Sequence, residues 1–171
     1  MRRREMMGAA PAAVAALLAS KEASAQRAGQ RASRGMPMPR IRDIRVIACA
    51  PAGPRLCVVK VITDQDGLYW FGCASFWLRA DLIKPAVEQY LKPLLVGRTV
   101  DRIEDIWQLC YDSSYWKNGP VLGNAISGVD QALWDIKGRM AGMPVYQLLG
   151  GKTREAVDAY RGVDGKTIPE A

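Results

Sequence analysis

The side chains that could do chemistry are few in this chain and form no recognisable catalytic set. The 171 residues include no histidine, which removes the commonest general base and the commonest zinc ligand. Asp130 and Asp135 are a carboxylate pair five residues apart on an expected helix. Five helical residues turn two side chains about 140° apart, so these carboxylates do not converge on one ion. We therefore expect both to be structural or solvated, with no catalytic residue and no metal ligand in this chain.

The positive charge of the chain is concentrated at its beginning. The net charge is +7, and residues 1–45 alone hold ten basic and three acidic side chains. Residues 46–171 hold 14 of each kind and are therefore neutral. Because a nucleic-acid surface needs basic groups on the folded part, we expect no nucleic-acid partner.

The basic beginning is typical of an export signal. Arg2-Arg3-Arg4 precedes the apolar run from Gly8 to Ala19, which at 12 residues is too short to span a bilayer. Ala23-Ser24-Ala25 has the small residues of a cleavage site. We predict a twin-arginine signal peptide over residues 1–25, a flexible linker over 26–40, a periplasmic location and no stable membrane insertion. The alternative is a leader without a sorting role, or a misassigned start, in a cytoplasmic protein.

The cysteines show no metal-ligand spacing. Cys49 and Cys57 flank an expected hairpin turn and could approach each other there. An export route for folded proteins does not require disulfides, so we favour free thiols at all four positions (Cys49, Cys57, Cys73 and Cys110).

The remaining pattern predicts an α+β fold. Residues 41–49, 56–63 and 68–73 read as three strands joined by short turns, which is an antiparallel meander. Apolar residues at helical spacing predict three helices after the strands. The first covers residues 82–94, and Pro93 should break or bend it near its end. The second begins near Ile103 behind an expected Asp101–Glu104 capping box, and the third runs along residues 126–140. A short helical turn is expected at 145–149 and a further strand at 156–160.

Particular segments within these elements carry a family resemblance. They are Gly67 with Trp70-Phe71-Gly72, then residues 94–98, 102–107, 115–120 and 125–151. In this order and spacing, the chain over about residues 41–165 resembles the N-terminal capping domain of the enolase superfamily, in the mandelate racemase and muconate lactonizing enzyme branch. It is most similar to acid-sugar dehydratases related to mannonate dehydratase. The resemblance implies a cap over residues 41–151, a three-stranded meander followed by a helical bundle, and the start of a (β/α) barrel at 152–171.

The family resemblance also implies an activity. It implies a Mg²⁺-dependent hydro-lyase that removes the proton next to a carboxylate and expels water from the neighbouring carbon, the metal neutralising the enediolate charge. The metal ligands and acid–base groups of such enzymes lie on the barrel, beyond Ala171. We therefore expect this chain to bind no Mg²⁺ and to be inactive alone. The expected partners of the full-length protein are a sugar-acid substrate, its own barrel domain and further copies of itself.

Two loops would supply the cap's contribution to the substrate pocket, residues 50–55 and 73–79. The resemblance implies that Pro54, Phe76, Trp77 and Arg79 cover or contact the distal part of the substrate. The alternative is that the aromatic residues pack under the cap or at a subunit contact.

Some alternatives stay open. Trp77 replaces a substrate-binding asparagine of mannonate dehydratases, and Gly162 replaces a histidine of related sequences, so the acid sugar is not specified. A racemase or cycloisomerase of the same superfamily, or a free-standing cap that binds a small acid or a protein, are the other readings. We expect Trp107 and Trp134 to be core residues, and Trp116 and Lys117 to be helix-packing and surface groups.

Overall fold

The computed structural model describes residues 38–51, 55–76, 79–115, 117 and 119–159. The chain separates into two units, residues 1–37 and residues 38–171, and all described residues belong to the second. The predicted signal peptide, nearly all of the linker, and Pro54, Trp77, Trp116 and Gly162 therefore lie outside the described residues.

A three-stranded antiparallel sheet forms one layer of the domain. Its strands β1 (Ile41–Cys49), β2 (Leu56–Thr63) and β3 (Tyr69–Cys73) lie in the order β1-β2-β3. Every second residue of the central strand is buried, as the alternating pattern predicts for a sheet with one covered face. The turn between β2 and β3 uses Gly67 at φ +77°, a conformation that glycine adopts without strain. The predicted meander is confirmed.

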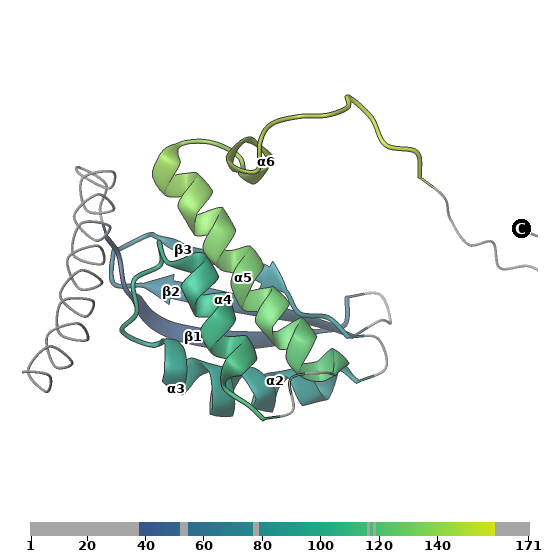
Figure 1. The fold of residues 1–171 in the computed structure, drawn as a ribbon. Helices are drawn as coiled ribbons and strands as arrows, with labels where there is room; N and C mark the ends of the chain where they lie inside the picture. The colour runs from purple at the N-terminus through teal and green to yellow at the C-terminus, as the bar shows by residue number, and fades with distance from the viewer. Residues whose placement is uncertain (1–37, 52–54, 77–78, 116, 118, 160–171) are drawn as a thin grey trace, which may run out of the picture. The chain divides into compact units, whose positions relative to one another are not determined.

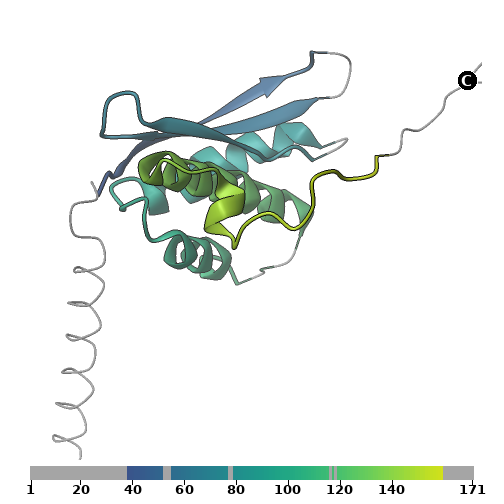
Figure 2. The ribbon, with the colours of Figure 1, turned by 90° about the horizontal axis from the view of Figure 1, so that it is seen from above.

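Helices form the second layer, and Figure 2 shows them on one side of the sheet. The first helical stretch is made of η1 (Ala80–Leu82), α2 (Ile83–Pro85), a π-helical segment η2 (Ala86–Leu91) and α3 (Lys92–Leu95). It is followed by α4 (Ile103–Asp112), α5 (Pro120–Ala141) and α6 (Val145–Leu148) (Figure 1). The α+β fold is thereby confirmed. The helical stretch changes from the π-helical segment η2 to α3 next to Pro93, which falls in the first turn of α3, where a missing N–H is tolerated.

Helix α5 contributes many of the buried residues of the core. Its predicted apolar face is buried at Ile126, Val129, Leu133 and Ile136, whereas Met140 is half-buried. The helix begins with Pro120 and ends at Gly142, whose φ of +66° and N–H bond to the Arg139 carbonyl close the last turn. Trp107 and Trp134 lie at the margin of the core, half-buried and packed against it.

Two glycines let α5 lie directly on β3. A Cβ on Gly72 would be 1.9 Å from the carbonyl oxygen of Gly128, and a Cβ on Gly128 would be 2.7 Å from the Cβ of Ala74. Only residues without a side chain fit where the helix backbone meets the strand. This contact fixes α5 against the end of β3 from which the second loop leaves.

Two local predictions are wrong. The capping box does not form, because α4 begins at Ile103 with Arg102 at the N-cap position and no side-chain cap. The Oδ1 atom of Asp101 is instead buried without a hydrogen-bond partner. Residues 156–159 form no strand, since a strand needs a neighbour to accept its backbone hydrogen bonds and none of the described segments lies beside it.

None of the described helices has the length and the apolar character needed to cross a membrane.

Candidate functional site

The two loops that the sequence singles out leave the same end of the sheet. In the meander, Cys49 pairs with Leu56 at the end of β1, and Val58 pairs with Cys73 at the end of β3. The connections from β1 to β2 and from β3 to η1 therefore start side by side. We name this end of the domain, residues 50–55 and 74–79, the loop end.

Hydrogen bonds to β2 and α5 hold the root of the second loop. Ala74 donates its N–H to the Cys57 carbonyl at 2.9 Å, and the Cys57 N–H donates to the Ser75 Oγ at 3.0 Å. The side chain of Gln131 on α5 accepts the Cys73 N–H at 3.0 Å and also approaches the Cys73 carbonyl. The loop therefore departs from a fixed point of the core.

The predicted site residues of the second loop have different surroundings. Arg79 is exposed and its side chain forms no ion pair with another described residue. Phe76 is half-buried and packs against the hydrophobic core. It is therefore not a free loop residue. A role toward a ligand stays a prediction for Phe76 as for Arg79.

An ion pair that sequence reasoning missed links the two loops. Arg55, at the end of the first loop, pairs with Asp81, which follows the second loop on η1. Both side chains are largely exposed, so the pair contributes little to stability. The pair places a negative charge beside Arg55. Arg79 is then the arginine of the loop end whose side chain has no ion-pair partner among the described residues. No local spacing signals a pair of residues so far apart in the chain.

All four cysteines are free thiols, two buried and two exposed. Burial raises the pKa of the Cys110 thiol to about 11. Burial, followed by the charge of Asp81, also raises the pKa of Cys57, whose Sγ lies 3.0 Å from the Ala80 carbonyl. These shifts make both buried thiols poor nucleophiles.

The carboxylates of α5 do not make a metal site. Asp130 and Asp135 line the same hollow as Trp70 and Trp134, but Asp135 is paired with Arg139 at 3.5 Å. Burial and then the charge of Glu104 raise the pKa of Asp130. The part of the chain that the structure describes contains no group of three or more side chains that could hold a metal ion. The described residues therefore do not fit a Mg²⁺ ion, and no chemical step is assigned to one here.

A meander covered on one face by a helical layer, with two loops leaving the same end of the sheet, is the arrangement expected of a capping domain. Comparison of the sequence agrees with this class. Residues 37–150 match the family described as mandelate racemase / muconate lactonizing enzyme, N-terminal domain, and the chain belongs to this family.

Members of the D-galactonate dehydratase family are similar in sequence to about three quarters of this chain. A D-galactonate dehydratase family member from Enterocloster bolteae is 57% identical over 130 residues, which are 76% of this chain and 32% of the relative. A second such protein, from Enterococcus gallinarum, is 53% identical over 77% of this chain and 33% of its own length. The chain thus spans about a third of the length of the curated relatives it matches.

Solved structures show the same domain. A crystal structure of an enolase from Pantoea ananatis with bound D-gluconate and Mg is 52% identical, with a TM-score of 0.66 over 68% of this chain and 28% of that one. The structure of a member of the enolase superfamily from Salmonella Typhimurium gives a TM-score of 0.64 at 32% identity, over 69% of this chain and 31% of that one. The similarity confirms the fold and the superfamily expected from the sequence.

Proposed function

We propose that this chain supplies the substrate-covering domain of an acid-sugar dehydratase. The observation that carries the proposal is the match of residues 37–150 to the capping-domain family, together with 52% identity to a protein crystallised with D-gluconate and Mg. The chemistry itself, including any Mg²⁺ that neutralises an enediolate, belongs to a barrel domain of the full-length protein.

The loop end would perform the covering. Arg79 offers a guanidinium free of a described partner, which suits a carboxylate or hydroxyl at the distal end of a sugar acid. Phe76 packs against the core, and we propose that Trp77 and Pro54 form with it an apolar cover that excludes water. The fixed root at Ala74 and Ser75 would hold this cover in one position. We also propose that the full-length protein forms homo-oligomers.

A domain exchange tests the proposal. Residues 38–151 would replace the corresponding cap of the Pantoea ananatis protein, and keto-acid formation would be measured with a panel of aldonic and aldaric acids. We expect turnover of at least one acid sugar, and none from the 171-residue chain alone. A second exchange that keeps the core of this chain but carries the recipient's own two loops separates a failure of docking from a failure of the loops.

Within the active chimera, Arg79→Ala should raise KM at least about tenfold, the loss of one charge-assisted contact. Arg42→Ala is the matched control, because Arg42 is also exposed but lies near the start of β1, away from the loop end. Inactivity of both folded chimeras, or equal effects of the two substitutions, would refute the proposed role.

A further inference from the structure

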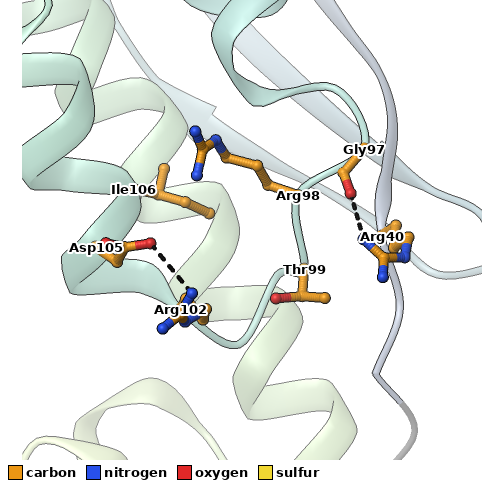
Figure 3. A pocket seen from close by; sticks show the side chains of 7 residues that line it. All are labelled: Arg40, Gly97, Arg98, Thr99, Arg102, Asp105 and Ile106. Carbon is orange, nitrogen blue, oxygen red and sulfur yellow. Dashed lines mark hydrogen bonds and ion pairs between the residues drawn. The ribbon is translucent and has the colours of Figure 1, made fainter. Parts of the chain in front are cut away.

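Three arginines line a hollow beside α3 and the beginning of α4, at the opposite end of the sheet from the loop end. The hollow has a volume of about 320 Å³ and is lined by Arg40, Arg98 and Arg102, with Thr99, Asp105 and the backbone of Gly97. Figure 3 shows Arg98 and Arg102 beside α4 and Arg40 across from them, on the strand side. We name this feature the arginine hollow. No part of the proposed function uses it.

Backbone hydrogen bonds make the floor of the hollow rigid. Arg40 and Thr99 form an antiparallel bridge just before β1. The Ile41 N–H donates to the Arg98 carbonyl at 2.9 Å, and the Gly97 N–H donates to the Ile41 carbonyl at 2.8 Å. Gly97, at φ +88°, allows the chain to turn there after α3. Arginines from distant parts of the sequence are thereby held around one space.

The side chains are anchored without using all their donors. Arg40 donates from Nη1 to the Gly97 carbonyl at 2.7 Å, and Arg98 donates from Nε to the Leu94 carbonyl at 2.8 Å. A guanidinium has five N–H groups, so most of them are left for a ligand. Arg102 is held only by a long contact of 3.8 Å from Nη1 to the Asp105 carboxylate.

The charge of the hollow sets the class of ligand. Three guanidinium groups and one carboxylate leave an excess of two positive charges among the lining residues. Planar guanidinium forks match the oxygen geometry of phosphate, and a dianion would balance this excess. We propose that the arginine hollow is a binding site for a small phosphate-class dianion, either free phosphate or the phosphate group of a small metabolite.

The test follows the backbone amides of the full 171-residue chain by NMR while inorganic phosphate is added at constant ionic strength. We expect saturable shifts at Gly97 and Thr99, which chloride does not reproduce. Glycerol phosphate, added in a parallel titration, distinguishes a phosphomonoester site from one for the free ion. The leader is basic as well, and its amides should shift weakly and without saturation.

Two substitutions that should change the affinity for phosphate in opposite directions make the test specific. Arg102→Gln should weaken binding about fivefold or more, since it removes one charge-assisted contact. Asp105→Asn should strengthen it about twofold or more, because it removes the one carboxylate among the described lining residues. Arg55→Gln, at the loop end, is the control and should change nothing. Arg102 supports no backbone carbonyl in the described structure, so the variant is expected to fold, which circular dichroism checks.

The proposal is overturned if no saturable shift occurs, or if Arg102→Gln and Arg55→Gln bind phosphate equally. It is also overturned if the same amides respond only to a polyanion such as heparin, because that would indicate a macromolecular surface instead of a small-ligand site.

Discussion

Replacing Gly128 by alanine should separate close packing from helix propensity. An added Cβ would lie 2.7 Å from the Cβ of Ala74 and 2.8 Å from a Cγ of Val59, both buried. Carbon atoms normally approach to about 3.5–4.0 Å, so the helix would have to move away from the sheet by about 1 Å. Overpacking of this kind costs about 1–3 kcal/mol, while alanine in a helix gains about 0.5–1 kcal/mol over glycine. We expect a net loss of about 0–2.5 kcal/mol in the free energy of unfolding, against a gain at an open helical position.

Gly123 provides the matched control on the same helix. Nothing lies within 4 Å of the Cβ that alanine would add there, and the position is exposed. Gly123→Ala should therefore raise the free energy of unfolding by about 0.5–1 kcal/mol. Urea titrations followed by circular dichroism would measure both variants. If Gly128→Ala proved as stable as Gly123→Ala, the close contact of α5 with β3 would be refuted.

Four further results are expected. At pH 8 a thiol reagent should label the exposed Cys49 and Cys73 rapidly, and the buried Cys57 and Cys110 only after unfolding. The pKa of about 11 at Cys110 leaves about one thiolate in a thousand at this pH. Asp130→Asn should stabilise the domain at pH 7, because burial and Glu104 raise the pKa of Asp130, and urea titrations should show the gain fading as acid protonates the wild-type carboxylate in the folded state. Asp43→Asn should destabilise the domain. Burial alone would raise the pKa of Asp43, but hydrogen bonds from cationic neighbours lower it below its ordinary value. The stabilisation by the ionised Asp43 should therefore be present above about pH 4 and lost as the pH falls through the lowered pKa of the folded state. Finally, replacing Arg3 and Arg4 by lysine should keep the precursor in the cytoplasm if the predicted twin-arginine signal is correct, and an unchanged periplasmic yield in cell fractions would contradict it.

The elements that the sequence predicts well are those with a local signal. The alternating residues of β2 can be buried only on one face of a sheet, and Asp66-Gly67 specifies the tight turn that follows. The apolar period of α5, ended by Gly142, likewise determines a helix before any partner is known. These features sufficed for the fold class and, with the family resemblance, for the superfamily.

The features that the sequence misses depend on the position of a neighbour. Asp101 and Glu104 have the spacing of a capping box, but tertiary contacts start the helix at Ile103 and leave the aspartate outside the cap. The arginine hollow arises because the segment after α3 pairs with the start of β1, which places Arg40 beside Arg98. No periodicity within either segment carries that information.

The core and the loop end are separated in a way that suits a covering domain. The contact of Gly72 with Gly128 is made of backbone, and it fixes α5 on β3 at a place where any side chain would interfere. One residue beyond β3, Ala74 and Ser75 are already hydrogen-bonded to β2. The core therefore fixes the described root of the second loop, while Arg79 makes no ion pair with another described side chain. Side chains at such a tip can change without loss of the fold, and under the proposed covering role such changes would alter the choice of substrate.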